Sequence, residues 1–318
     1  MVSSSHKVLH TPICPKCGYD QSGEIATWQD QCPMEGRCPE CGLEFEWANV
    51  LDPARIELKW YIEHAKSKRG AVARTPGTLK KLLFPHLYWR EIGVVTQIQL
   101  SRLAVWLLFM LGCVHLFSSA LAGMGSWKYQ GNWGGGLGFS EYIQVNGLRC
   151  IPEELFNAIA LPFAHFEYGG GWHQFHWGDL DWSSLILSVV IISVFIGMTS
   201  FWIIILTALP VTRALVQLRG IHLIRAWMMS LFVLILNFEA VRASTGIMIW
   251  SNGGGVSQLI GYSHVAFLAC SIIWLQWFWI AALKVGWDIR PAWLIGILGV
   301  IGSLLAGFAI FMYIAVNA

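Results

Sequence analysis

The stretch AWLIGILGVIGSLLAGFAIFMYIAV, residues 292–316, contains no charged side chain and decides the class of fold. A helix that crosses a hydrocarbon layer of about 30 Å needs roughly 20 apolar residues, and this stretch is long enough. Four more apolar runs precede it, at residues 100–122, 183–209, 222–240 and 261–283. The sequence therefore predicts five membrane-spanning helices within residues 98–318.

The composition of the chain also indicates an integral membrane protein of the all-α class. Of the 318 residues, 55% are hydrophobic, 13% are charged and 18 are tryptophan. A typical soluble domain has about 25% charged residues. The net charge of +2 creates no overall field that would favour nucleic acid. The N-terminal residues MVSSSHKVLHTPICPKCG lack the apolar core of a cleaved signal peptide, so we expect none.

The distribution of lysine and arginine predicts the orientation of the spans, because short loops rich in these residues stay in the cytoplasm. Such residues are frequent in residues 51–102 and in the connections after the second and fourth spans, for example Arg213, Arg219 and Lys284. In the segment 125–182, acidic residues outnumber Lys128 and Arg149. We therefore expect a multi-pass protein of the bacterial inner membrane. Its N-terminus is cytoplasmic, and its loop 125–182 and C-terminus are extracytoplasmic.

Two cysteine pairs near the N-terminus have the spacing of a metal site. Cys14 and Cys17 form one C-x2-C pair, Cys38 and Cys41 form the other, and residues 18–37 separate them. Four thiolates suit the tetrahedral coordination of zinc and leave no coordination position open for catalysis. The sequence predicts one structural Zn2+ per chain, in a small β ribbon at residues 1–50. Metal binding would supply folding free energy on the order of 10 kcal/mol.

The surroundings of these cysteines narrow the function of the ribbon. Cys32 lies between the pairs, and we expect a spare thiol there, with replacement of one of the four ligands as the alternative. Between residues 14 and 47 the cations are Lys16 and Arg37, and acidic residues outnumber them: Asp20, Glu24, Asp30, Glu35, Glu40, Glu44 and Glu46. An acidic surface binds phosphate poorly, so we expect no nucleic acid partner. A protein-docking or structural role follows.

The segment 51–97 mixes aromatic and basic residues, as amphipathic helices on a cytoplasmic membrane surface do. Asp52 and Pro53 suit the start of one helix, and a second helix is expected after the Pro76–Gly77 break. We expect Trp60, Tyr61, Ile62 and Ala65 to face the membrane or a partner. The cations expected to reach membrane lipids are Lys59, Lys66, Lys68, Arg69, Lys80 and Lys81. A solvated linker helix is the alternative.

Ionisable residues within spans indicate a second polar site, because such residues are costly in hydrocarbon. The predicted orientation places His115, Glu239 and His264 at one depth, in the outer half of the membrane. The outer loop adds His165, His173 and His176, which could join them in a metal or proton site. The alternatives are an interfacial aromatic belt, an ordinary Glu239–Arg242 ion pair and haem ligation by His115 with His264.

Small residues recur on two spans and predict close helix packing, within one bundle or between two copies of the chain. They are Gly299, Ser303 and Gly307 on the fifth span and Ser193, Gly197 and Ser200 on the second. Cys113 and the loop residue Cys150 both lie on the predicted outer side, where a disulfide is chemically allowed. Their pairing is left open.

Enzyme motifs are absent from the sequence. Glu153 and Glu154 resemble the first motif of intramembrane CAAX-type proteases, but the arginine that this motif needs shortly afterwards is missing. No Ser/His/Asp set, P-loop or dinucleotide fingerprint occurs. We therefore lean towards a protein that is not an enzyme.

Several longer strings carry a resemblance to known families. CPKCGYD at 14–20 and RCPECGLEF at 37–45, followed by a basic segment and spans, resemble bacterial zinc-ribbon membrane proteins. TPGTLKKLLFPHLYWREI at 75–92 and WLQWFWIAALKVGWDIRPAWLIGILGVIGSL at 274–304 are similar to the Yip-domain membrane proteins. This resemblance implies five spans, a cytoplasmic N-terminus and a role in membrane trafficking or organisation through protein contacts. The sequence departs from that family in its long connection between the first two spans.

These observations together favour a non-enzymatic membrane scaffold or accessory subunit. It would bind partner proteins, or a second copy of itself, through the ribbon and the outer loop. The alternative is an intramembrane enzyme or metal-handling protein that uses the outer histidines and Glu239.

Overall fold

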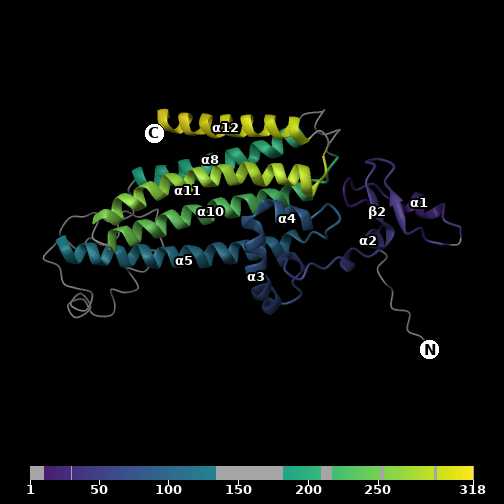
Figure 1. Ribbon diagram of the computed structural model, residues 1–318, viewed down its shortest axis with the longest axis horizontal. Coiled ribbons are helices and arrows are strands. Elements are labelled where there is room, and N and C mark those ends of the chain that lie inside the picture. Colours follow the sequence, from purple (N-terminus) through teal and green to yellow (C-terminus); the bar gives the residue numbers. More distant parts are fainter. Residues whose placement is uncertain are drawn as a thin grey trace. The chain divides into compact units, whose positions relative to one another are not determined.

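The computed structural model describes residues 11–29, 31–133, 182–208, 217–250, 254–289 and 292–317 (Figure 1). The first elements are α1 (Ser22–Ala26), β1 (Glu35–Arg37), β2 (Glu44–Glu46), α2 (Trp47–Leu51), α3 (Lys68–Leu83) and α4 (Pro85–Glu91). The long helices are α5 (Leu100–Trp133), α8 (Trp182–Thr207), α10 (Gly220–Trp250), α11 (Gly254–Ala281) and α12 (Ala292–Asn317). A π-helical turn, Ala282–Gly286, follows α11.

The chain divides into two compact units. The first unit combines Met1–Trp106, Trp202–Met228 and Trp277–Gly299. The second combines Leu107–Phe201, Met229–Gln276 and Val300–Ala318. Both units therefore contain parts of several long helices, and each unit is built from segments that lie far apart in the sequence.

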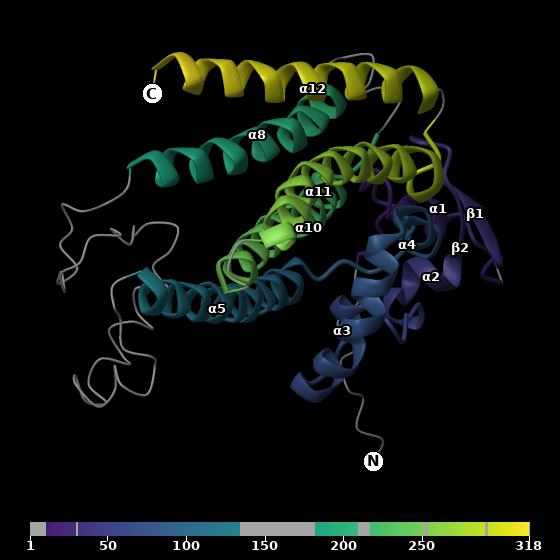
Figure 2. The ribbon, with the colours of Figure 1, turned by 60° about the vertical axis from the view of Figure 1, so that its left-hand side comes forward.

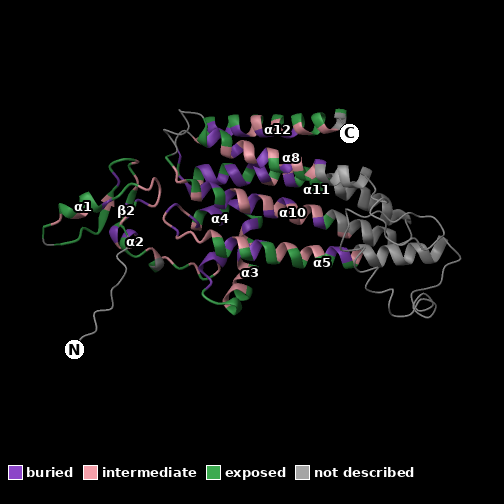
Figure 3. Ribbon diagram, turned by 180° about the vertical axis from the view of Figure 1, so that it is seen from behind, coloured by how far each residue is buried: buried purple, intermediate pink, exposed green. Residues whose placement is uncertain are grey.

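Within the described residues, five helices are long and apolar enough to cross a membrane, which agrees with the prediction. These spans are Leu100–Leu121, Val190–Thr207, Gly220–Ala240, Ala266–Gly286 and Ala292–Ile314. Exposed residues occur along much of α12 (Figure 3), and Phe308 is 62% exposed. Lipid tails are as apolar as these side chains, so such exposure is compatible with a bilayer. The chain has the character of a multi-pass membrane protein.

The N-terminal segment contains the predicted small β structure. Strands β1 and β2 are antiparallel, with Glu35 opposite Glu46, Gly36 opposite Phe45, and Arg37 opposite Glu44. Phe45 is buried while both of its neighbours on β2 are exposed, as expected for a strand with one covered face.

The segment 51–67 is not the helix that the sequence predicted. Only the short 3-10 turns Pro53–Arg55 and Ile62–His64 form there, and α3 begins at Lys68. Tertiary hydrogen bonds occupy backbone groups that a helix would use. The Leu58 N–H donates to His64 Nδ1 at 2.8 Å, and the Trp60 carbonyl accepts from Thr78 at 2.9 Å.

The predicted helix break at residues 76–77 is also wrong, because α3 continues through Pro76 to Leu83. Ser67 caps the start of this helix by accepting a hydrogen bond from the Gly70 N–H at 3.1 Å. Proline removes one intrahelical hydrogen bond, and side chains around it bind carbonyls of the same helix. The Thr75 hydroxyl donates to the Ala71 carbonyl at 2.9 Å.

The aromatic residues that follow the ribbon are buried inside the first unit instead of facing lipid. Tyr61 is fully buried, and α4, which lies beside α3 (Figure 2), contributes the fully buried Trp89. The Trp89 ring lies 5.3 Å from Phe278 and 5.4 Å from Trp287, between ring centroids. A Cβ on Gly286 would lie 2.6 Å from this ring, so a larger residue does not fit there. The segment is thus anchored to the end of the fourth span.

The small residues of the second and fifth spans provide close packing within the chain, as predicted. In the first unit, a Cβ on Gly299 would lie 2.1 Å from the ring of Trp202. In the second unit, a Cβ on Gly307 would lie 2.7 Å from Met198 Cγ. Glycine at these positions lets α8 and α12 approach each other more closely than any larger residue would allow.

Replacing Gly302 with alanine should destabilise the protein. The new Cβ would lie 2.1 Å from Cε1 of Phe201, and over-packing of this kind costs about 1–3 kcal/mol. We expect a lower midpoint of thermal unfolding in detergent. Gly296→Ala on the same helix is the matched control, because the nearest atom, in Ile280, lies 3.9 Å away. Equal losses for the two variants would contradict the packing argument.

Candidate metal centre and a polar pair in the membrane helices

The four predicted cysteine ligands converge in the ribbon. Cys14 Sγ lies 3.7 Å from Cys41 Sγ, and Cys17 Sγ lies 3.6 Å from Cys38 Sγ. All four sulfur atoms lie within 4.8 Å of one another. Among the described residues, no other group of three or more histidine, cysteine or acidic side chains is placed to hold a metal ion. The four sulfurs therefore form the candidate metal centre.

Each cysteine pair lies on a tight turn that ends in glycine. Gly18 and Gly42 have φ values of 86° and 66°, which other residues seldom adopt. Their N–H groups donate to the carbonyls of Cys14 and Cys38, both at 2.9 Å. The turns hold both cysteines of each pair on the same side, towards the centre of the cluster.

Two of the four thiols, those of Cys17 and Cys41, are poorly ionised before a metal binds. Burial raises the pKa of Cys17 to about 11 and also raises the pKa of Cys41. A metal ion binds the thiolate form, so its binding releases these protons. The apparent affinity for metal is therefore expected to rise with pH.

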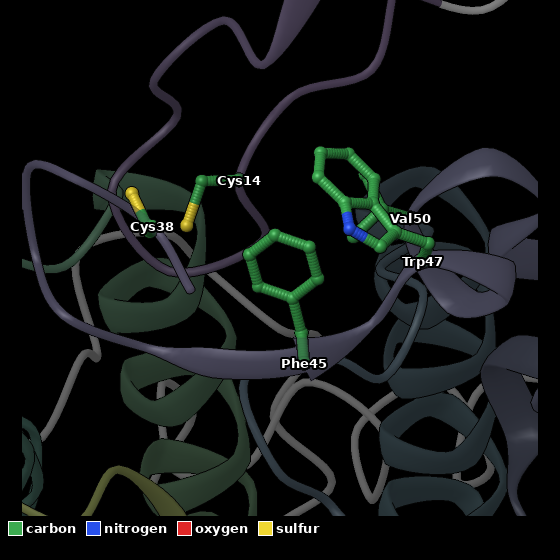
Figure 4. Packing of buried hydrophobic residues seen from close by; sticks show 5 residues of the cluster. All are labelled: Cys14, Cys38, Phe45, Trp47 and Val50. Atoms are coloured by element: carbon green, nitrogen blue, oxygen red, sulfur yellow. The ribbon is translucent and has the colours of Figure 1, made fainter. Parts of the chain in front are cut away.

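A small hydrophobic cluster lies beside the sulfurs. Figure 4 shows Phe45 between the two buried cysteines, Cys14 and Cys38, and the residues Trp47 and Val50. The Phe45 and Trp47 rings meet edge to face, with centroids 5.1 Å apart. A core of this size is too small to fold an isolated segment, so a metal ion held by the four cysteines would add the stability that this core lacks.

The first cysteine turn is bound to the beginning of α10. His222 Nε2 lies 2.8 Å from the Pro15 carbonyl, and the Arg219 N–H donates to the Lys16 carbonyl at 2.9 Å. Because a carbonyl only accepts hydrogen bonds, His222 carries a proton on Nε2. The metal centre is thereby connected to the third membrane span. The sequence did not predict this role for His222.

The structure brings together two residues of the predicted second polar site. His115 Nδ1 lies 2.8 Å from Glu239 Oε1, and the Ser118 hydroxyl donates to the other carboxylate oxygen. The Glu239 side chain is 6% exposed and that of His115 is 31% exposed. The sequence predicted that His115 and Glu239 lie at the same depth in the membrane, and the structure adds the direct hydrogen bond between them.

Other predicted residues of that site lie outside the described part of the chain. This applies to His165, His173 and His176, and to the side chains of Arg242 and His264. The predicted loop site, the Glu239–Arg242 pair and the haem pair therefore stay predictions. Cys150 also lies outside the described residues, whereas Cys113 is exposed on α5 and Cys32 is exposed outside the sulfur cluster.

Two of the six cations predicted to contact lipid are paired with acidic side chains. Lys66 Nζ lies 2.8 Å from Glu57, and Lys81 forms an ion pair with Glu91 and lies 4.2 Å above the Trp60 ring. Hydrogen bonds and charge from Lys66 and a second cation, Arg74, lower the pKa of Glu57 to about 2. The other four are exposed: Lys59, Lys68, Arg69 and Lys80.

A buried charged network in the first unit was missed by the sequence analysis. Arg225 of α10 and Glu63 are both fully buried, and Tyr61, Glu63 and Tyr88 are electrostatic neighbours of Arg225. The Tyr61 hydroxyl and the Gln99 N–H donate to the two oxygens of Glu63. Burial raises the pKa of Tyr61, so it remains a neutral donor. The only sequence signal was an arginine inside an apolar run.

These features define the class of protein: a mostly helical chain in which the described residues include five helices able to span a membrane and four cysteines near the N-terminus that could hold a metal ion. Comparisons with protein-family models, with curated proteins and with solved structures find no match to the chain.

Proposed function

We propose that this protein is a non-enzymatic scaffold or accessory subunit of the bacterial inner membrane. Its N-terminal ribbon, stabilised by one zinc ion, binds a basic surface of a partner protein on the cytoplasmic side. The observation that carries the proposal is the acidic outer surface of the β1–β2 hairpin.

The hairpin retains an unfavourable arrangement of charge. Glu35 lies directly opposite Glu46, and both are exposed. Like charges in this position destabilise an antiparallel pair. Glu44 and, in the second cysteine turn, Glu40 are exposed as well. Lysine or arginine side chains of a partner would relieve this repulsion, so a basic protein surface fits the hairpin.

Zinc suits the geometry of the cysteine cluster. Four sulfurs placed tetrahedrally at about 2.3 Å from a zinc ion lie about 3.8 Å apart. The Cys14–Cys41 and Cys17–Cys38 sulfur separations are 3.7 and 3.6 Å, and all four sulfur atoms lie within 4.8 Å of one another. A tetrahedral set of four sulfurs also suits iron, so metal analysis of the purified protein identifies the ion. All four ligands come from the protein, which supports a structural role.

The distribution of cations supports a cytoplasmic ribbon. Exposed Lys59, Lys68, Arg69 and Lys80 lie between the ribbon and the first span. Positively charged segments next to a span remain in the cytoplasm. With five spans, the C-terminus then lies on the extracytoplasmic side.

Charge removal on the hairpin tests the proposed partner. Chemical cross-linking in native membranes should capture a partner with the wild-type chain. The triple variant Glu35→Gln, Glu44→Gln, Glu46→Gln should capture much less of this partner. High salt should have the same effect on the wild type, because it screens exposed charges.

Two controls make this experiment decisive. Glu24→Gln, an exposed residue of α1 outside the hairpin, should retain the partner, and the triple variant should retain its metal. A wild-type chain that is alone and monomeric in mild detergent would contradict the proposal. Capture that is insensitive to the triple variant would contradict the role of the hairpin.

A further inference from the structure

An ionisable pair lies inside two membrane spans of the second unit. His115 belongs to the span Leu100–Leu121 of α5, and Glu239 belongs to the span Gly220–Ala240 of α10. A charged side chain within a span is costly, and an ionisable residue there is by default a candidate for a functional site, of which a proton relay is one kind. Here the Glu239 side chain is 6% exposed, and its Oε1 lies 2.8 Å from His115 Nδ1. The carboxylate is therefore removed from solvent but held by a specific partner.

Ser118 satisfies the other carboxylate oxygen in both of its protonation states. Its Oγ is within hydrogen-bond distance of Glu239 Oε2 and lies 3.0 Å from the His115 carbonyl. A hydroxyl can donate one proton and accept others. When Glu239 is ionised, Ser118 donates to Oε2. When Oε2 carries a proton, it donates to Ser118, and Ser118 donates to the His115 carbonyl instead.

The hydrogen bonds of Ser119 and of His115 Nδ1 are unaffected by this exchange. Ser119 donates to the His115 carbonyl at 2.7 Å, and a carbonyl oxygen has two lone pairs, so it accepts both hydroxyls. Nδ1–H of His115 donates to Oε1 whether or not Oε2 is protonated. Oε1, Oε2 and the Ser118 hydroxyl therefore each keep a hydrogen-bond partner when the site takes up one proton.

We propose that Glu239 is a reversible proton-binding site within the membrane domain, with His115 and Ser118 as positioning residues. One O–H bond forms at Oε2 on uptake and breaks on release, and water at a membrane face supplies and receives the proton. The other described titratable side chains of the second unit are Cys113, Cys270 and Tyr313. Arg242 follows Glu239 by three residues on α10, and His264 belongs to α11.

Labelling of the wild-type protein tests this site without a mutation. A hydrophobic carbodiimide reacts with protonated carboxyl groups in apolar surroundings. In protein reconstituted into lipid vesicles, we expect the labelled fraction of Glu239, measured by mass spectrometry, to rise at least several-fold from alkaline to acidic pH. Labelling that does not change with pH would overturn the proposal. Failure to label Glu239 in the folded protein, when the denatured protein is labelled, would overturn it too.

Infrared titration provides an independent measurement. The carboxylic-acid carbonyl absorption that appears as the pH falls should contain one titrating component that is missing in Glu239→Gln, whereas the components of the other acidic residues remain. The control Glu91→Gln, which removes an acid paired with Lys81 outside the spans, should keep the Glu239 component. A spectrum in which Glu239→Gln removes no titrating component would show that Glu239 is a static partner of His115.

Discussion

Replacing Cys38 with serine should abolish metal binding and unfold the ribbon. Its sulfur lies 3.6 Å from Cys17 Sγ at the centre of the cluster. A structural zinc site contributes about 10–16 kcal/mol, far more than the small cluster around Phe45 and Trp47 can replace. We expect metal analysis to show a fall from one ion per chain to nearly none. Limited proteolysis should then cleave within residues 11–51.

Cys32→Ser is the matched control for this result. Cys32 is exposed and is not one of the clustered sulfurs, so this variant should keep its metal and its resistance to protease. Loss of metal in Cys32→Ser would mean that this residue replaces one of the four ligands. Full metal content in Cys38→Ser would contradict the assignment of Cys38 as a metal ligand.

Removing the buried charge of Arg225 should destabilise the first unit strongly. Arg225→Met leaves the fully buried Glu63 without its cationic neighbour, and breaking a buried pair of charges costs about 3–5 kcal/mol. The free energy of unfolding, measured by denaturant titration in micelles, should fall by about 3–5 kcal/mol. Tyr61 and Gln99 still donate to Glu63, which keeps the loss at the lower end of that range.

A double-mutant cycle separates the charge effect from lost packing. If an unpaired Glu63 causes the loss, adding Glu63→Gln to Arg225→Met should recover part of it. Arg69→Met, at an exposed cation, should change stability by less than about 0.5 kcal/mol. Strictly additive losses in the cycle would mean that Arg225 and Glu63 do not interact.

The membrane helices could be predicted because hydrophobicity is a local property. The third run was expected at residues 222–240, and the span is Gly220–Ala240. The fourth was expected at 261–283, and the described span is Ala266–Gly286. A run of apolar side chains determines by itself that its backbone must form internal hydrogen bonds in lipid, so no knowledge of neighbouring helices is needed.

The cysteine cluster that could hold a metal ion was predictable for a related reason. Each C-x2-C pair places two sulfurs on one turn whose shape depends on a few adjacent residues, with Gly18 and Gly42 supplying the positive φ. Beyond the two local turns, the four-sulfur cluster requires only that these turns pack against each other. By contrast, the attachment of the Pro15 carbonyl to His222 joins residues 207 positions apart, and no local pattern indicates it.

The segment 51–67 shows how tertiary contacts override local preference. Asp52 and Pro53 favour a helix, yet Tyr61, Ile62 and Glu63 are buried by other segments of the first unit. Their burial and the hydrogen bonds of the Leu58 and Trp60 backbone to the side chains of His64 and Thr78 offset the loss of helical bonds. The free energy gained by packing exceeds the intrinsic helix propensity of these residues, which is small for each residue.

The sequence alone was sufficient for the five candidate spans found in the described residues, for their approximate bounds and for the four clustered cysteines, because these depend on side chains within a few residues of one another. The partners of Glu239 and Arg225 depended on tertiary structure. His115 and Glu239 are 124 positions apart, and either could have met other polar groups. Which buried groups meet is decided by the packing of helices far apart in the chain, since only that packing removes both groups from water and makes their contact favourable.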